Sequence, residues 1–347
     1  MLRVSIIGCG MIARKRHFPE MQENPNVQLV ACSDYILERA QEIAAVYGCK
    51  AYQDYKELLK LEKPDVVVVC TNNATHAQVT LDSLQVGAHV LCEKPMCANL
   101  DEAREMILMA RQAGKKLMIA QNQRMAPAHQ KAKEILESGR LGNVLTFRTV
   151  FGHPGCEYWS IDGASSWFFK KDLAIFGCLA DLGVHKVDLL RWLLDDEFDE
   201  VSSFCATRDK KGPDQKPISV EDNMIGLLHS RKGIIGTIAT SWTYYGPEDN
   251  STIIYCQKGI MSISADPKYL VKIDYPDGTK ELYEIGGIGT NDKPVKTGID
   301  DEFINSILED RTPAISGEEG YNSLAVAVAL HKSYESRELS KVLHFNE

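Results

Sequence analysis

Asp181 and His185 are the residues whose types and spacing most directly suggest chemistry. They lie four residues apart in a stretch, 178–194, that reads as one helix, so we expect both side chains on one face. A carboxylate beside an imidazole suits proton transfer from an alcohol, because histidine titrates near neutrality and the carboxylate can raise its basicity or hold a substrate. A surface ion pair is the alternative. Half a metal site is a third reading, but no neighbouring ligand pair completes it, and we predict no metal.

Lys94 is the second candidate for a catalytic role. It follows a strand-like run, 89–92, and precedes Pro95, which disfavours helical backbone at the lysine and permits a cis peptide bond. Ligands of open α/β sheets bind outside the carboxyl ends of the strands. The pattern therefore predicts an ammonium group held at a sheet edge, although a solvated Glu93–Lys94 turn that ends at proline fits this segment equally well.

The segment Gly8–Ala13 has the pattern G-x-G-x-x-A between a strand-like and a helix-like stretch. The first glycine permits a tight turn, the second lets a pyrophosphate approach the backbone, and Ala13 lets helix and strand pack closely. Asp34 follows the second strand-like run, where a carboxylate can accept both adenosine-ribose hydroxyls, so we predict NAD rather than NADP. Arg39 keeps NADP open, and Asp34 could also cap the helix that follows it.

These residues need a scaffold, and the apolar periodicity indicates two kinds. Up to residue 122, β-branched runs alternate with helix-period stretches, which predicts an α/β fold with a doubly wound parallel Rossmann sheet. Beyond it, consecutive strand-like runs between 201 and 284 predict an α+β domain with a large, mostly antiparallel sheet. We assign 1–122 to NAD binding and 123–347 to substrate binding and oligomerisation. The last strand, 341–345, is expected to pack back near the domain junction.

The bulk composition excludes several classes of protein. The chain has 347 residues, of which 44% are hydrophobic, and this length suits two domains. Its net charge is −9 without a basic run, which argues against nucleic acid or membrane surfaces as partners. The sequence shows neither a signal peptide nor an apolar run of about 18 residues, so we expect a cytoplasmic protein. The ten cysteines lack CxxC spacing and read as buried, reduced thiols.

Taken together, these segments resemble the Gfo/Idh/MocA family of glucose–fructose oxidoreductases, inositol dehydrogenases and relatives, over nearly the whole chain. Residues 8–13 look like its nucleotide loop, 87–95 are close to its strongest signature, and 181–185 fit its Asp-x-x-x-His helix. Weaker matches are 71–76, with Asn72 where proline is usual; 121–124, with Gln123 replacing an arginine; Gly177-Cys178, where two glycines are frequent; and 301–304, Pro313 and 316–320, which look like the C-terminal signature.

The resemblance implies a dehydrogenase and a role for each site residue. Lys94 would orient the nicotinamide ribose and polarise the reacting hydroxyl. His185 would take the proton of that hydroxyl, and Asp181 would form a hydrogen bond with the adjacent hydroxyl or with Lys94. The expected cofactor contacts are Gly8, Gly10, Met11, Ile12, Ala13, Asp34, Arg39, Thr71, Asn73, His76, Glu93, Lys94 and Asn122. The expected substrate contacts are Lys94, Asn122, Arg124, His153, Trp167, Asp181 and His185.

The expected substrate is a sugar, a glycoside or a polyol such as an inositol-like cyclitol. Trp159, Trp167 and Trp242 could offer flat faces to a pyranose ring, or could belong to the core or a subunit interface. By resemblance we expect a homodimer or homotetramer formed through the second sheet. Two other functions stay open: a glycosidase that uses NAD for a transient oxidation, and a non-catalytic NAD-binding regulator.

Overall fold

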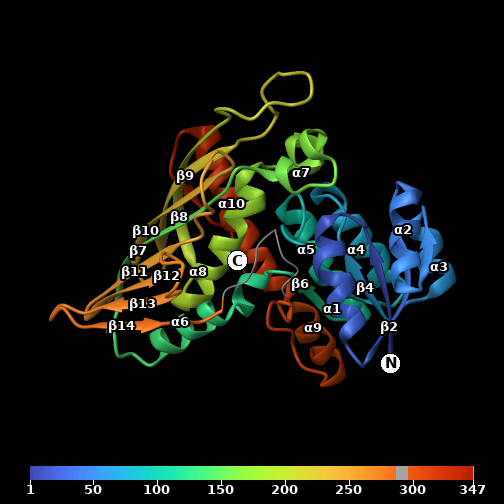
Figure 1. The fold of residues 1–347 in the computed structure, drawn as a ribbon, viewed down its shortest axis with the longest axis horizontal. Helices are drawn as coiled ribbons and strands as arrows, with labels where there is room; N and C mark the ends of the chain where they lie inside the picture. The colour runs from blue at the N-terminus through green and yellow to red at the C-terminus, as the bar shows by residue number, and fades with distance from the viewer. Residues whose placement is uncertain (287–295, 347) are drawn as a thin grey trace. The chain divides into compact units, whose positions relative to one another are not determined.

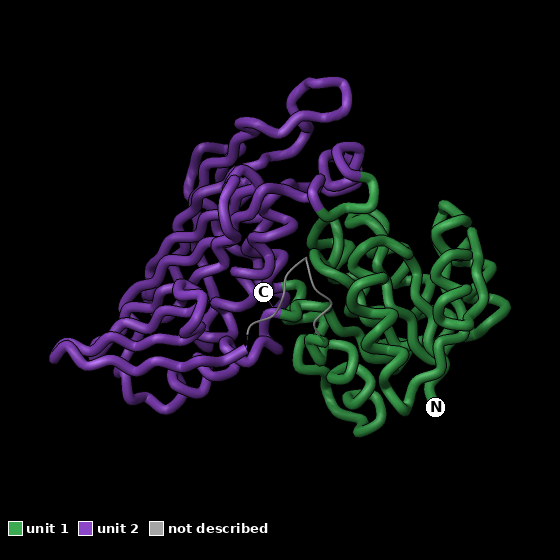
Figure 2. The backbone as a smooth tube through the Cα atoms, viewed as in Figure 1, with its two compact units in different colours: residues 1–122, 159–162, 289–321 green, residues 123–158, 163–288, 322–347 purple. Residues whose placement is uncertain are grey.

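A computed structural model describes residues 1–286 and 296–346, which form two compact units (Figure 2). The first unit contains residues 1–122, the segment 159–162 and, among the described residues, 296–321. The second contains 123–158, 163–286 and 322–346. Every residue after 122 was expected in the second domain, whereas 159–162 and 296–321 group with the first unit.

The first unit is built on a six-stranded sheet with the order β3-β2-β1-β4-β5-β6, and all of its strand pairs are parallel. Its strands are β1 (Leu2–Ile7), β2 (Val27–Ser33), β3 (Lys50–Tyr52), β4 (Val66–Val69), β5 (His89–Cys92) and β6 (Leu117–Ile119). Its helices are α1 (Phe18–Glu23), α2 (Leu37–Tyr47), α3 (Tyr55–Glu62), α4 (His76–Gln85), α5 (Leu100–Ala113) and α9 (Ile299–Leu308) (Figure 1). This strand order is that of a dinucleotide-binding Rossmann fold, which confirms the first half of the predicted fold class.

The local sequence explains these elements. All four residues of β4 are buried valines, as expected for a parallel strand with helices on both faces. Asn99 caps α5 by accepting the Glu102 N–H, and Gly114 ends the same helix in the left-handed conformation. The strand β3 was not predicted, because Lys50-Ala51-Tyr52 is not an apolar run, unlike the equally short β6.

The helical segment 11–23, which follows β1, contains a π-turn, Ala13–His17, before α1. A π-turn holds one residue more than an α-helical turn, and such turns are common at functional sites. A second π-turn, Leu179–Gly183, precedes α8 in the other unit. The sequence predicts a plain helix for each of these segments.

The second unit is built on a nine-stranded sheet with the order β14-β13-β12-β11-β7-β10-β9-β8-β15. Its strands are β7 (Val144–Gly152), β8 (Phe198–Ala206), β9 (Asn223–Ser230), β10 (Ile235–Ser241), β11 (Thr252–Cys256), β12 (Gly259–Ile263), β13 (Val271–Asp274), β14 (Lys280–Tyr283) and β15 (Ser340–Lys341). Strands β7 and β10 pair in parallel and the other pairs are antiparallel, which confirms the predicted mostly antiparallel sheet. The last strand is shorter than expected and pairs with β8 at the sheet edge.

The helices of the second unit are α6 (Pro127–Glu137), α7 (Lys171–Ala174), α8 (Val184–Leu194) and most of α10 (Gly317–Ser336). One face of the sheet packs against α6, α8 and α10 (Figure 1). The other face carries exposed apolar side chains. Phe204 and Ile225 are paired on β8 and β9, Leu227 lies two positions after Ile225, and Ile235 begins β10. None of the helices in the described ranges is both long and apolar enough to cross a membrane.

Candidate active site

The glycine-rich turn after β1 has the geometry that a dinucleotide requires. Gly8 has φ +97°, and a Cβ there would lie 2.4 Å from the Cys70 carbonyl oxygen, so only glycine fits. A Cβ on Gly10 would meet no described atom within 4 Å, so the backbone is open on that side. The helical segment behind it begins with half-buried Met11 and Ile12. An accessible backbone at a helix N-terminus can bind a pyrophosphate, and the turn therefore fits the cofactor.

Asp34 connects the end of β2 to this turn. Its carboxylate accepts the Cys9 N–H at 2.9 Å and the Ile36 N–H at 2.9 Å. Because α2 begins at Leu37 with Ile36 as its N-cap, the alternative that Asp34 caps the helix is wrong. A carboxylate has about four lone-pair positions, so two remain for the hydroxyls of a ribose.

Arg39 lies in the first turn of α2 and is paired. Its guanidinium contacts the Asp162 carboxylate at 2.5 and 3.4 Å, within the first unit. The Arg39 carbonyl accepts a hydrogen bond from Arg14, whose Nε also donates to the Cys9 carbonyl of the glycine-rich turn. These contacts place the backbone of Arg39 beside that turn.

His76 connects the segment after β4 with the segment after β5. Its Nδ1 lies 2.8 Å from the Pro95 carbonyl oxygen, and its Nε2 lies 3.1 Å from the Thr71 carbonyl oxygen. The peptide bond between Lys94 and Pro95 is cis. His76 is buried, as is Asn73 in the same segment. His76 therefore has a direct structural role, while cofactor contacts of Thr71 and Asn73 stay a prediction.

Glu93 belongs to a buried charge network under Lys94. His17, at the end of the π-turn, places Nε2 3.0 Å from the Glu93 carboxylate and Nδ1 2.8 Å from that of Asp300 in α9. Burial alone would lower the pKa of His17, but the Asp300 charge raises it well above its usual value. Burial would raise the pKa of Glu93, but the hydrogen bond and charge of His17, with Arg16, hold it well below its usual range.

This network fixes the residue that precedes Lys94. The second Glu93 oxygen accepts the Lys94 N–H at 3.1 Å, and Glu93 is only 4% exposed. His17 and Asp300 were not among the predicted site residues, and they are separated by 283 positions in the chain. No local pattern could have joined them. Glu93 as a cofactor contact stays a prediction.

In the second unit, Asp181 lies in the π-turn that precedes α8 and is buried. Its Oδ2 accepts the indole N–H of Trp242 at 3.1 Å. Trp242 is completely buried, so it is a core residue that orients Asp181 and not a platform for a pyranose ring. His185 follows in the first turn of α8, 8% exposed, with its ring centroid 6.1 Å from that of Phe151.

Glu221 holds the start of this helical segment. One of its oxygens accepts the N–H groups of Gly177 at 2.7 Å and Leu179 at 3.1 Å, as anions do at helix N-termini. A Cβ on Gly177 would lie 1.9 Å from the Glu221 carbonyl oxygen, which explains the glycine. Burial raises the pKa of Glu221. This residue was not predicted, because a lone glutamate in a loop carries no positional signal.

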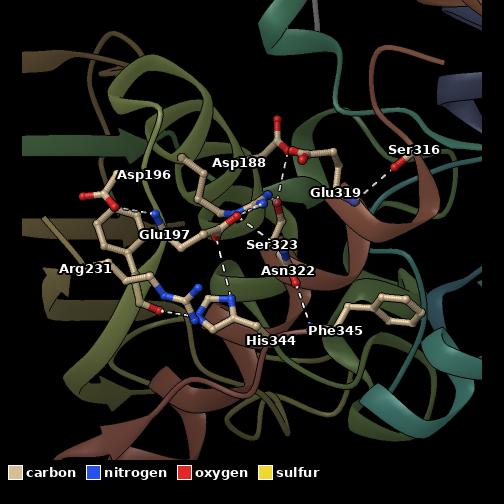
Figure 3. Close-up of polar contacts among 12 residues, drawn as sticks. Asp188, Asp196, Glu197, Arg231, Ser316, Glu319, Asn322, Ser323, His344 and Phe345 are labelled. Atoms are coloured by element: carbon tan, nitrogen blue, oxygen red, sulfur yellow. Dashed lines mark hydrogen bonds and ion pairs between the residues drawn. The ribbon is translucent and has the colours of Figure 1, made fainter. Parts of the chain in front are cut away.

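Arg124 is held in a buried bidentate ion pair. Its Nε and Nη2 each lie 2.7 Å from an oxygen of Asp188 on α8, and both side chains are almost wholly buried. Ser323 also donates to Asp188, and the neighbouring Asn322 donates to Glu197 (Figure 3). Such geometry is typical of a positioning contact between α8 and the segment before α6. A substrate contact by Arg124 stays a prediction.

The remaining expected substrate residues are placed as follows. His153 is buried, and its Nδ1 accepts the Gly155 N–H at 2.9 Å. Trp167 stacks on Phe168 with the ring centroids 3.9 Å apart. Asn122, the last residue of the first unit before the boundary, is buried. Their roles toward substrate or cofactor stay predictions.

The structure thus gathers two sets of residues. The glycine-rich turn, Asp34, the segment 71–76 and Lys94 follow the carboxyl ends of β1, β2, β4 and β5 in the first unit. Asp181 and His185 belong to the second unit. The convergence of Lys94 with His185 stays a prediction. Within residues 1–286 and 296–346, no group of three or more histidine, cysteine, aspartate or glutamate side chains is arranged to hold a metal ion.

A Rossmann sheet with an open glycine-rich turn and an acid after its second strand defines a dinucleotide-binding protein. Residues 2–121 match the family model described as oxidoreductase family, NAD-binding Rossmann fold, and residues 129–262 match the GFO/IDH/MocA C-terminal domain. The chain is 30% identical to D-glucoside 3-dehydrogenase of Escherichia coli K12 over 96% of both proteins. It is 25% identical to myo-inositol 2-dehydrogenase of Thermotoga maritima over 98% of both.

Solved structures agree with the fold. The complex of levoglucosan dehydrogenase with NADH superimposes with a TM-score of 0.87 at 21% identity, over 99% of this chain and 100% of that one. The chain therefore belongs to the Gfo/Idh/MocA family of NAD(P)-dependent oxidoreductases.

Proposed function

We propose that this protein oxidises a secondary hydroxyl of a sugar, glycoside or cyclitol, with NAD as the hydride acceptor. The observation that carries the proposal is the position of Lys94, two residues after the end of β5 and fixed by the hydrogen bond of its N–H to Glu93. An ammonium group at the carboxyl edge of a Rossmann sheet lies on the side where the nicotinamide of a dinucleotide binds. The relatives named above, a glucoside and an inositol dehydrogenase, support this substrate class.

The first unit supplies the groups that would hold NAD. The open backbone at Gly10 and the helix behind it would bind the pyrophosphate, with Met11, Ile12 and Ala13 in the first turn. Asp34 would accept the ribose hydroxyls. NAD supplies the hydride acceptor when it is bound. An NADP preference is disfavoured, because the Asp34 carboxylate would repel a phosphate on that ribose.

Three side chains would act on the substrate. We assign to Lys94 the polarisation of the reacting hydroxyl, because a cation stabilises the developing alkoxide. His185 would accept the hydroxyl proton, since an imidazole is a base near neutral pH. Asp181, oriented by the Trp242 indole, would hydrogen-bond an adjacent hydroxyl. The proposal requires that the two units bring Lys94 and His185 to one substrate.

The test is NADH formation from NAD with a panel of methyl glucosides, anhydro sugars and inositols. We expect a steady rise of NADH absorbance with at least one class of substrate. Release of an aglycone without net NADH would instead indicate the glycosidase, and NADH binding without any turnover would indicate the regulator. Lys94→Ala should abolish turnover while NADH still binds, whereas Lys60→Ala, on the exposed face of α3, should leave both unchanged. Full turnover by Lys94→Ala would refute the assigned role.

We also propose that two copies of the chain associate through the exposed face of the nine-stranded sheet. Phe204 and Ile225 are directly paired on neighbouring strands and are 72% and 63% exposed, and Leu227 extends the patch. An apolar patch of this kind is typical of a subunit interface. Leu227→Glu should lower the mass measured by light scattering, and an unchanged mass would contradict this interface. A cytoplasmic location stays a prediction.

A further inference from the structure

We propose that Asp162 is a cofactor-specificity residue. By pairing with Arg39 it prevents this arginine from binding the 2′-phosphate of NADP, so that the protein selects NAD. The inference rests on the proposed use of NAD and adds to it a residue outside the Rossmann sequence itself. An arginine in the helix after Asp34 is otherwise the group that could accommodate such a phosphate.

The geometry makes Asp162 the partner of Arg39. The Arg39 Nη2 lies 2.5 Å from one Asp162 oxygen, and Nη1 lies 3.4 Å from the other. Two guanidinium nitrogens thus face one carboxylate, which is also how an arginine would bind a phosphate. The segment 159–162 that carries the aspartate groups with the first unit, although the chain on both sides of it belongs to the second.

The contact lies where the adenosine ribose would bind. Arg39 is five residues after Asp34, and its carbonyl accepts from Arg14, which is also bonded to the Cys9 carbonyl of the glycine-rich turn. The side chains of Arg39 and Asp162 are 18% and 28% exposed, so both are still within reach of a ligand.

The local charges favour the neutral ribose over its phosphate. Burial alone would lower the pKa of Arg39, but the hydrogen bond and charge of Asp162, together with the charge of Asp34, raise it. Arg39 therefore lies in the field of two carboxylates. A 2′-phosphate, with nearly two negative charges near neutral pH, would have to displace Asp162 and lie close to Asp34. The hydroxyl of NAD meets neither obstacle.

The simpler explanation is that the ion pair only anchors the segment 159–162. Such a pair would contribute to stability, and its loss would weaken NADH and NADPH binding alike. The specificity role makes a different prediction, because it concerns the ratio of the two affinities. The test therefore uses that ratio.

The experiment measures the dissociation constants of NADH and NADPH by fluorescence titration of the full-length protein and of Asp162→Asn. We expect NADPH to bind about tenfold more tightly to the variant, the equivalent of about 1.4 kcal/mol, while the NADH constant changes less than about threefold. In the double variant Asp162→Asn with Arg39→Ala, the NADPH gain should disappear. Asp310→Asn, which removes an exposed ion pair with Lys116 before β6, is the matched control and should change neither constant.

The outcomes separate the two proposals. If the unmodified protein binds neither dinucleotide, the proposed function fails and this inference fails with it. If it binds NADH and the NADH-to-NADPH ratio is the same in Asp162→Asn, the proposed function stands and the role of Asp162 is refuted. A gain of NADPH affinity that survives Arg39→Ala would also refute it, because the phosphate would then be bound by another group.

Discussion

Lys186, the neighbour of His185 on α8, should give the protein a pH-dependent stability. Its side chain is completely buried, and its amine donates to the Asn250 carbonyl at 2.8 Å and to the Thr252 hydroxyl at 3.3 Å. Burial lowers its pKa from 10.5 to about 7, against the opposing charges of Asp249 and Glu248. Between pH 7 and about 10.5 the unfolded chain therefore binds a proton that the folded chain does not.

The sign and size of the effect follow from this difference. Because the unfolded state binds more protons in that range, the free energy of unfolding rises with pH. At about 1.4 kcal/mol for each pKa unit, the gap between 10.5 and about 7 corresponds to about 5 kcal/mol. His17 acts in the opposite direction. Its raised pKa stabilises the fold below pH about 6.5, and that stabilisation is lost as the pH rises through the folded pKa.

The comparison of variants isolates Lys186. Urea unfolding of the protein and of Lys186→Met, followed at pH 7 and pH about 9.5, gives the change of each free energy with pH. We expect Lys186→Met to be the more stable protein at pH 7 and to lose most of the difference at the higher pH. Lys133→Met, which removes an ion-paired lysine on α6, should keep the pH dependence of the unmodified protein. An identical pH dependence in Lys186→Met would show that the buried amine does not titrate as argued.

Three further predictions concern site residues of the two units. In Gly10→Val the valine side chain would point into open space, so the melting temperature should stay within about 2 °C of that of the unmodified protein. NADH binding should be lost. Retained NADH binding would exclude the turn as the pyrophosphate site. His17→Gln should lower kcat by about tenfold. Thermal melts across pH should also show a smaller loss of stability above pH about 6.5 than in the unmodified protein. An unchanged stability profile would show that His17 is not coupled to the charge of Glu93. Trp242→Phe removes the N–H donated to Asp181 and should lower kcat/KM by about tenfold, with near-normal activity as the contrary result.

The parts of the fold that the sequence could predict are those with local periodicity. The buried valines of β4 and the turn at Gly8 could be predicted because each depends only on residues next to it in the chain. The parallel direction of the strands follows from the alternation of strand and helix, and the structure confirms it. The three-residue strand β3 was missed, since Lys50-Ala51-Tyr52 lacks the apolar run that marks β6.

The sequence pointed to candidate site residues, whose roles stay predictions, but it did not point to the partners that hold their side chains. Asp181 stands out by its spacing from His185, whereas its donor Trp242 lies 61 positions away and resembled any buried aromatic. Arg124 was expected to contact the substrate, and its ion pair with Asp188 depends on the packing of α8 against a distant segment. Long-range hydrogen bonds of this kind have no signature in a single sequence, because they depend on tertiary packing.

The two π-turns bear on how this protein can change in length. The turns at Ala13–His17 and Leu179–Gly183 each hold one residue more than an α-helical turn. Deleting that residue would leave a regular helix, but every side chain before the deletion would rotate by about 100° relative to those after it. In one helix this would turn the glycine-rich end away from His17, and in the other it would rotate Gly177 relative to the side chains of α8. Natural variants of this chain should therefore tolerate insertions in the surface loops far better than a single lost residue in either helix.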